Sequence, residues 1–247
     1  NVSLWSDISN ALKGELGGIT GAPSKGTFIA FEGGEGTGKS TQSKMLKKWL
    51  EERGEVVVLS REPGGTDLGQ GLRKILLGHE TGEISPRAEA LLYAADRAHH
   101  VYSVIRPALA NGDVVITDRY FDSSIAYQGA GRVLSPGEVA RISRWATESL
   151  FPTLTIVIDL PAEIGIGRLK NRDRLEAEPL AFHERVRQEF LQIARLDPER
   201  YLVVDGTQSI DAIHNEITKR IATLPSISHE VKVPKLKKTI KKSAKKK

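Results

Sequence analysis

A glycine-rich stretch that ends in Lys-Ser, residues 33–40, constrains this chain more than any other feature. It matches G-x-x-x-x-G-K-[ST] at each fixed position and directly follows the apolar run 27–32. Glycine within an ordered element costs about 1 kcal/mol relative to alanine, so a glycine cluster indicates backbone that bends sharply or approaches a ligand closely. Helical spacing of apolar residues begins at Lys39. The stretch therefore predicts a phosphate-binding loop between a strand and a helix.

The chemistry of phosphate binding explains the spacing. Successive backbone N–H groups cradle phosphate oxygens, and the start of the following helix adds the positive end of its dipole. Lys39 is expected to reach the β- and γ-phosphates, and the Ser40 hydroxyl is expected to ligate Mg²⁺. A chance glycine-rich turn is the alternative, and the strand before it and the helix after it disfavour that alternative. The expected triphosphate-binding residues are Gly33, Gly34, Glu35, Gly36, Thr37, Gly38, Lys39, Ser40 and Thr41.

Strand-like and helix-like segments alternate from residue 27 onward. Apolar strands are expected at 27–32, 55–60, 113–118, 154–160 and 201–204. Helical patterns are expected at 39–53, 67–77, 86–110, 120–128, 136–148, 162–171, 180–196 and 209–223. In the 86–110 pattern one side is apolar, with Ala88, Leu91, Leu92, Ala95 and Ala98. This alternation predicts an α/β fold with a five-stranded, mostly parallel sheet flanked by helices on both faces.

Composition and charge divide the chain into a body and a tail. The chain has 247 residues, no cysteine and no apolar run of membrane-spanning length, which excludes disulfide scaffolds and thiolate chemistry. Residues 231–247 carry nine lysines and no acid, so subtracting nine from the net charge of +5 leaves −4 for the rest. The absence of cysteine and of a secretory signal in residues 1–26 suits a cytoplasmic location.

Asp118 and Arg119 narrow the class of nucleotide-binding protein. Asp118 closes the run "VVIT" and is placed to act on Mg²⁺, directly or through water, while Arg119 supplies a cation at the same strand end. A GTPase would carry Asn-Lys-x-Asp, which does not occur in the sequence. A small-molecule kinase fits the chain length best.

Three further motifs follow the loop in order: "REPGGT" (61–66), "LLYAADRAHH" (91–100) and "DRYFDSSIAYQG" (118–129). With them, residues 27–223 resemble the bacterial thymidylate kinases of the P-loop nucleoside monophosphate kinase family. The resemblance implies transfer of the γ-phosphoryl group of ATP to dTMP with Mg²⁺. It also implies a homodimer packed through core helices.

The resemblance also implies where dTMP binds. Tyr93 would stack on thymine and Arg97 would hydrogen-bond the base; the two lie four residues apart, on one face of a helix. Tyr127 would lie against the sugar and disfavour a 2′-hydroxyl. The implied dTMP-binding residues are Arg61, Glu62, Pro63, Arg73, Tyr93, Arg97, Arg119, Ser124, Tyr127 and Gln128, with Arg132 a weaker candidate.

The catalytic assignments combine the loop with a basic segment, "GRLKNRDRLE" (167–176). This segment resembles the family's LID over ATP, where Arg168 would bind ATP and Arg172 or Arg174 would neutralise charge in the transition state. Glu35 would face the acceptor's sugar or phosphate. The implied catalytic residues are Lys39, Arg119, Arg172, Arg174 and Glu35, and the implied metal-holding residues are Ser40, Asp118 and Glu62.

Both ends exceed what the resemblance covers. We expect residues 1–26 to be an extension and linker, 27–223 the kinase domain, and 224–247 a disordered lysine-rich tail. The tail could contact nucleic acid or an anionic surface, or have no partner. Two alternative functions stay open: a kinase of another deoxynucleoside monophosphate, and a nucleic-acid- or anion-binding protein that uses the tail. His99, His100, His183 and His214 show no metal-ligand spacing and are expected on helix surfaces.

Overall fold

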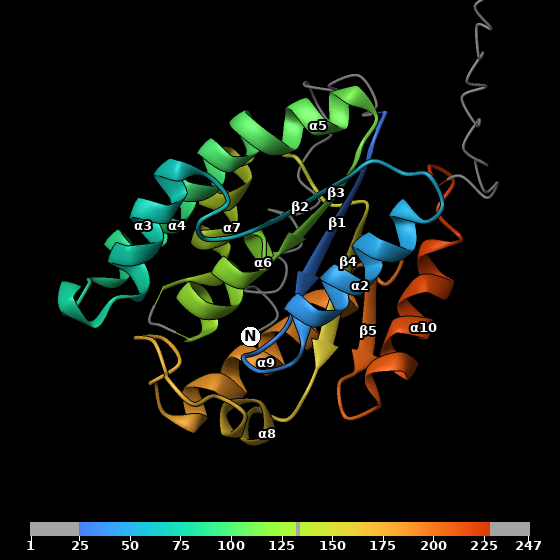
Figure 1. The fold of residues 1–247 in the computed structure, drawn as a ribbon. Helices are drawn as coiled ribbons and strands as arrows, with labels where there is room; N and C mark the ends of the chain where they lie inside the picture. The colour runs from blue at the N-terminus through green and yellow to red at the C-terminus, as the bar shows by residue number, and fades with distance from the viewer. Residues whose placement is uncertain (1–24, 132–133, 228–247) are drawn as a thin grey trace, which may run out of the picture.

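The computed structural model describes residues 25–131 and 134–227 (Figure 1). Five strands form one sheet in the order β2-β3-β1-β4-β5, and all four strand pairs are parallel. The strands are β1 (Thr27–Glu32), β2 (Val57–Arg61), β3 (Val114–Asp118), β4 (Leu154–Asp159) and β5 (Tyr201–Asp205). The predicted α/β fold with a five-stranded sheet is confirmed, and the sheet is wholly parallel.

Helices cover both faces of this sheet (Figure 1). The α-helices are α2 (Lys39–Glu51), α3 (Asp67–Leu77), α4 (Pro86–His100), α5 (Arg106–Asn111), α6 (Phe121–Ser124), α7 (Pro136–Ala146), α8 (Ala162–Gly167), α9 (Leu180–Leu196) and α10 (Ile210–Ile221). A 3₁₀ turn, η1 (His79–Thr81), and two π-helical segments, η2 (Val101–Ile105) and η3 (Ile125–Gly131), complete the described elements. Helices α2 and α10 pack on one face, whereas α4, α5, α7 and α9 pack on the other.

The central strand β1 shows why two cores form. Its side chains alternate, so Phe28 and Ala30 enter one hydrophobic cluster while Ile29 and Phe31 enter the other. All four are almost completely buried. Burial of each large side chain contributes about 1.5–3 kcal/mol, which favours a strand covered on both faces.

Helix α4 differs from its predicted orientation. Ala88, Leu91 and Ala95 of the expected apolar side are exposed, and Leu91 has 57% of its surface accessible. The side facing the protein instead carries polar groups such as Arg97 and His100. These groups bind a loop rather than a hydrophobic core, so apolar periodicity identified the wrong face. The helix predicted at 86–110 is also divided into α4, η2 and α5, and the one predicted at 162–171 ends at Gly167.

The carboxyl ends of the parallel strands bring the predicted motifs to one edge. Asp118 of β3 is in register with Phe31 of β1 on one side and with Arg61 of β2 on the other. The glycine-rich loop leaves β1 at this edge and leads into α2.

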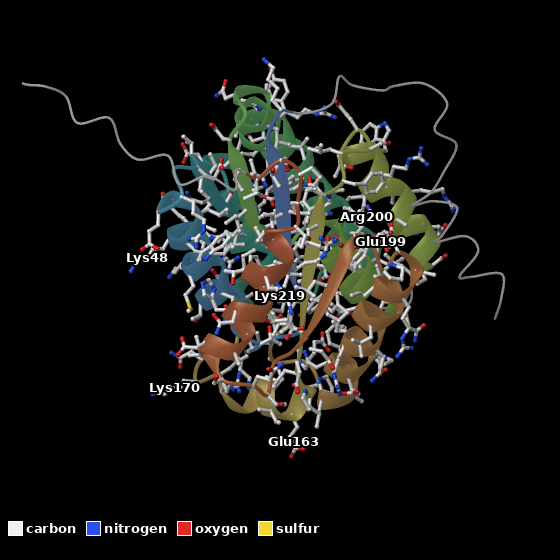
Figure 2. The ribbon with its side chains drawn as sticks, turned by 90° about the vertical axis from the view of Figure 1, so that its right-hand side faces the viewer. Lys48, Glu163, Lys170, Glu199, Arg200 and Lys219 are labelled. Atoms are coloured by element: carbon white, nitrogen blue, oxygen red, sulfur yellow. The ribbon has the colours of Figure 1, made fainter. Side chains whose placement is uncertain are left out.

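The folded part of the chain continues beyond residue 223, the predicted end of the kinase domain. Leu224 and Ile227 are buried in the cluster beneath α10, and the Thr27 hydroxyl donates to Ser226 Oγ at 2.6 Å. The rim of the fold is charged, and Figure 2 shows Lys48, Glu163 and Lys170 extending outward. Within the described ranges, no helix combines the length and apolarity needed to cross a membrane. Residues 1–24 of the expected extension and linker, and the lysine tail beyond Ile227, lie outside the described part of the chain.

Candidate active site

The glycine-rich loop requires glycine at two positions for identifiable reasons. Gly36 has φ +63°, and a Cβ there would lie 2.1 Å from the carbonyl oxygen of Gly165 on α8. Gly38 has φ +94° and caps α2, a conformation that favours glycine. The loop is therefore fixed against α8 with its backbone at the start of α2.

Lys39 is buried within the loop. Its ammonium donates to the carbonyl oxygens of Gly33, at 3.1 Å, and of Gly34, at 2.6 Å. Burial, together with the nearby Arg119 cation, lowers the pKa of Lys39 to about 8. The ammonium is thus held at the loop by neutral acceptors, which leaves it suited to an anionic ligand.

The structure brings together Ser40 and Asp118, the two residues expected to act on Mg²⁺. The Ser40 hydroxyl, in the first turn of α2, donates to Asp118 Oδ2 at 2.6 Å. A hydroxyl and a carboxylate are oxygen donors of the kind that Mg²⁺ prefers, and Mg²⁺ usually completes its shell with water and substrate phosphates. The pair fits a magnesium ion bound together with a nucleotide.

Arg119 stands at the centre of the site in an unusual backbone conformation, with φ +72°. Its Nη1 donates to Gly33 O at 3.0 Å and to Ser123 Oγ at 3.1 Å, and its Nη2 donates to Glu35 Oε1 at 2.7 Å and to Tyr127 OH at 3.1 Å. The Tyr127 hydroxyl in turn donates to Glu35 at 2.6 Å. A left-handed conformation at a non-glycine residue costs of order 1–3 kcal/mol, and this set of partners offsets it.

The charge on Glu35 depends on this arrangement. Burial alone would raise the pKa of its carboxyl, but Arg119 and Lys39 lower that pKa to about 2. Glu35 is therefore a carboxylate throughout the neutral range. The structure places Glu35 against Arg119 and Tyr127, and its contact with the acceptor's sugar or phosphate stays a prediction.

Glu32, at the end of β1, contacts Ser123, which in turn binds Arg119. It was not predicted as a site residue. Its Oε1 accepts from the backbone N–H groups of Tyr120, at 2.8 Å, and Ser123, at 3.1 Å, and its Oε2 accepts from Ser123 Oγ at 2.6 Å. Since the Ser123 hydroxyl donates to Glu32, its lone pairs face Arg119. Burial and the neighbouring Asp122 carboxyl raise the pKa of Glu32 to about 8. Nothing in the local sequence distinguishes this glutamate from an ordinary strand end.

Two cavities meet at Arg119. The P-loop cavity, with about 810 Å³ of empty space, runs along residues 35–41 past Asp118. The inner cavity, with about 500 Å³, extends toward α4 and is lined by Tyr93, Tyr127 and Gln128 among others. Both are bordered by Glu35, Glu62, Arg73, Arg119 and Glu176. Two ligands bound in these cavities would face each other at those shared residues.

The segment 61–63 forms one wall of the two cavities, and its residues and Arg73 are held in different ways. Arg61 is exposed and lines the P-loop cavity. Arg73 Nη1 donates to the Pro63 carbonyl oxygen at 3.0 Å, and the Glu62–Pro63 peptide bond is cis. Glu62 is buried, with Oε2 accepting from Arg97 Nε at 2.7 Å and Oε1 bonded to His100 Nδ1 at 2.8 Å. Both of its oxygens are occupied by protein groups, so the structure does not offer Glu62 as a ready metal ligand.

The predicted base-binding residues lie at the far end of the inner cavity, some lining it directly and one behind them. Tyr93, Ser124 and Gln128 line the cavity directly. Arg97 lies behind them, 1% exposed, with Nη1 donating to Ser124 Oγ at 3.1 Å and Nη2 to Tyr120 O at 3.1 Å. Gln128 Nε2 donates to Glu89 Oε1 at 3.1 Å, which fixes the amide orientation because a carboxylate only accepts.

The three arginines between α8 and α9 point to different places. Arg168 Nη1 donates to Gly36 O of the P-loop at 2.9 Å. Arg172 is exposed and donates to Ile166 O, whereas Arg174 pairs with the buried Glu89 and donates to Leu76 O. The nearby lysine, Lys170, points outward (Figure 2). Residues 173, 175 and 176 of this segment line the inner cavity and were missed, because a loop gives no periodic signal.

The histidines correct one prediction. His100 is completely buried and His183 is 3% exposed, so neither lies on a helix surface. His99 and His214 are partly exposed. The two buried rings lie on helix faces that pack against the site. The apolar pattern of the surrounding sequence does not indicate that these faces are buried.

Comparisons with known proteins agree with one another. A family model described as thymidylate kinase matches residues 31–217. Curated thymidylate kinases from Clavibacter sepedonicus and from Leifsonia xyli subsp. xyli (strain CTCB07) are 57% identical over 203 residues and 56% identical over 200 residues. These alignments cover 81% and 79% of this chain and 96% and 94% of the relatives. A crystal structure of thymidylate kinase from Ehrlichia chaffeensis superposes with a TM-score of 0.66 at 32% identity, covering 79% of this chain and 98% of that one.

Proposed function

The chain belongs to the thymidylate kinase family and phosphorylates dTMP to dTDP, and from that premise we propose how its residues divide the reaction with ATP. The P-loop cavity takes the triphosphate and the inner cavity takes dTMP. One observation carries this division: the two cavities meet at Arg119, where a donor and an acceptor phosphate would face each other.

On the donor side, the backbone N–H groups of residues 33–41 and the Lys39 ammonium bind the phosphates of ATP. Arg168, already bonded to the loop, borders the same ligand. Ser40 and Asp118 would hold Mg²⁺, which when bound neutralises phosphate charge and orients the donor. Lys39 is placed to stabilise the negative charge that develops on the transferred phosphoryl group.

On the acceptor side, Arg61, Arg73 and Arg119 surround the position of the dTMP phosphate. Because that phosphate is already an ionised nucleophile, the protein needs to position it and neutralise charge rather than remove a proton. Glu35 and Tyr127 border the sugar, and Glu62 with Pro63 forms the adjacent wall. Tyr93, Ser124 and Gln128 face the base, with Arg97 holding Ser124 from behind.

A cation from the segment 168–174 completes the site during transfer. Arg174 would have to leave the buried Glu89, whereas Arg172 is exposed and donates to a neutral carbonyl oxygen. We therefore favour Arg172 as the residue that moves to the transferred phosphoryl group. Arg174 then stays paired with Glu89, which also binds Gln128 in the wall of the inner cavity.

An acceptor panel tests the proposal. ADP formation is measured with MgATP and dTMP, dUMP, dCMP, dGMP or the ribose form of TMP. Strong turnover with dTMP, weaker turnover with dUMP and poor turnover with the ribonucleotide are expected, because Tyr127 closes the sugar side of the cavity. Preference for another deoxynucleoside monophosphate would contradict the base-site assignment. The nucleic-acid alternative predicts instead salt-dependent DNA binding that disappears with residues 231–247.

We propose that the kinase domain comprises residues 27–223 and extends to Ile227, because Ile227 packs in the hydrophobic cluster with α10. We also propose a cytoplasmic location, which the lack of cysteine supports.

A homodimer is the proposed assembly, and the exposed side of α4 supports it. Ala88, Leu91 and Ala95 follow one another at helical spacing on the outer face of α4, and Tyr102 of the adjoining segment η2 is 76% exposed. Such an apolar stripe is typical of a surface that another protein covers.

Leu91→Glu should therefore convert the dimer to a monomer, because it places a charge in a dry interface. Sedimentation velocity measures the change, with Ile210→Glu on α10 as the matched control. Ile210 is equally exposed, at 57%, but lies on the opposite face of the sheet. A wild-type protein that sediments as a monomer, or a control that dissociates equally, would contradict this interface.

A further inference from the structure

Helix α4 holds the segment 62–64 through three side chains on its inner face. Asp96 Oδ1 accepts from the backbone N–H of Gly64 at 3.2 Å. Arg97 Nε donates to Glu62 Oε2 at 2.7 Å, and His100 Nδ1 lies 2.8 Å from Glu62 Oε1. Each carboxylate oxygen of Glu62 thus has its own partner on α4, at positions separated by less than one turn.

The hydrogen-bond roles of His100 follow from its partners. Glu62 is ion-paired with Arg97 and only accepts, so His100 Nδ1 must carry the hydrogen. On the other side of the ring, Nε2 lies 2.7 Å from Ser60 Oγ, at the end of β2. In the neutral ring Nε2 accepts from that hydroxyl. The imidazole therefore connects β2 to Glu62 through both of its nitrogens.

Packing leaves the ring little freedom. His100 is 0% exposed. A Cβ added at Gly65 would lie 2.7 Å from His100 Nε2 and 2.6 Å from Ser60 Oγ, so the backbone of the loop passes directly over the ring. A change of ring position would require the segment after Pro63 to move as well. Because Glu62 and Pro63 line the inner cavity, such a movement would reshape that cavity.

We propose that His100 is a positioning residue for the dTMP site: its Nδ1–H orients the Glu62 carboxylate and thereby fixes the Glu62–Pro63 wall of the inner cavity. His100 does not line either cavity, so it acts through Glu62. The inference deepens the proposed function and depends on the placement of dTMP in the inner cavity.

Two amide variants separate the nitrogens of the ring. The side-chain amide of asparagine reaches the place of Nδ1, and that of glutamine reaches the place of Nε2. His100→Asn therefore keeps a donor for Glu62, while His100→Gln loses that donor and keeps a partner for Ser60. We expect His100→Gln to raise KM for dTMP about tenfold, and His100→Asn to raise it less than about threefold. KM for ATP should change less than about twofold in both, since the P-loop does not touch the ring.

Ser60→Ala is the matched control on the other side of the ring, and it should leave KM for dTMP close to that of the wild type. Equal increases in the asparagine and glutamine variants would mean that His100 only fills space, and would overturn the proposal. An unchanged KM for dTMP in His100→Gln would overturn it too.

Glu62→Gln shows which statement has failed. If Glu62→Gln raises KM for dTMP and His100→Gln does not, the positioning role is wrong and the dTMP site stands. If neither variant changes it, the placement of Glu62 at dTMP is wrong and the proposal fails with it. Nitrogen-15 NMR of the wild-type histidines adds a test that needs no variant to fold: hydrogen on Nδ1 supports the proposal, and a bare Nδ1 overturns it.

Discussion

Lys39→Ala is expected to lower kcat about a thousandfold, which corresponds to ~4 kcal/mol of transition-state stabilisation. The ammonium is held within the P-loop by the Gly33 and Gly34 carbonyl oxygens, at the place where the β- and γ-phosphates of ATP would lie. Phosphoryl transfer spreads negative charge over the oxygens of the transferred group, and a buried cation stabilises that charge more strongly than an exposed one. The measurement is a coupled assay of ADP formation with saturating MgATP and dTMP.

Lys48→Ala provides the control for this loss. Lys48 lies on the same helix, its side chain is 80% exposed, and it points outward (Figure 2). Its removal should leave kcat within about twofold, since an exposed ion pair such as that of Lys48 with Glu52 contributes little. A Lys39→Ala variant that binds ATP and retains near wild-type kcat would contradict the assignment of Lys39 to the transferred phosphate.

Local chemistry made the donor half of this site predictable. The P-loop is a continuous run of residues that are neighbours both in sequence and in space. Asp118 lies 78 positions from Ser40, but it ends β3, which is paired with the strand that leads into the loop. Gly36 must be glycine because its own backbone turns there and α8 approaches it. A pattern of fixed spacing records such requirements directly, so the P-loop fold could be predicted and is confirmed.

The acceptor half depends on contacts between distant segments, and there the sequence was less informative. His100 meets Glu62 from 38 positions away, and Glu32 meets Ser123 from 91 positions away. A polar residue on a helix is more often solvated than buried, so both the histidine and the inner face of α4 were misassigned. Only the packed fold shows that this face binds a loop instead of water.

Arg119→Ala is the second change expected to have a large effect, lowering kcat about 10²- to 10³-fold. The guanidinium borders both cavities and contacts Gly33, Ser123, Glu35 and Tyr127. Arg119→Lys should recover only a small part of the loss, because a point charge cannot make the four forked contacts at once. Steady-state rates with dTMP and MgATP give the measurement.

The same substitution should change stability in a way that separates structure from chemistry. In the wild type, the pKa of Glu35 is about 2, below its ordinary value of 4.5. Glu35 therefore contributes up to about 3 kcal/mol of stability above pH 4.5, which is lost as the pH falls toward 2. Without Arg119, burial is opposed mainly by Lys39 and the Tyr127 hydroxyl, so the pKa of Glu35 rises and its buried carboxylate costs stability at neutral pH relative to the wild type. Urea unfolding should show the variant's deficit shrinking as the pH falls from 7 toward 3.

Adding Glu35→Gln to Arg119→Ala removes the uncompensated carboxylate and decides between the two roles. The double variant should regain much of the neutral-pH stability, because a neutral amide is far less costly to bury than an unpaired charge. Its kcat should stay as low as that of Arg119→Ala, since no cation returns to the junction of the two cavities. Recovery of both stability and kcat would show that Arg119 serves only to hold Glu35, and dTMP phosphorylation would then depend on Arg61 and Arg73 for its acceptor-side charge.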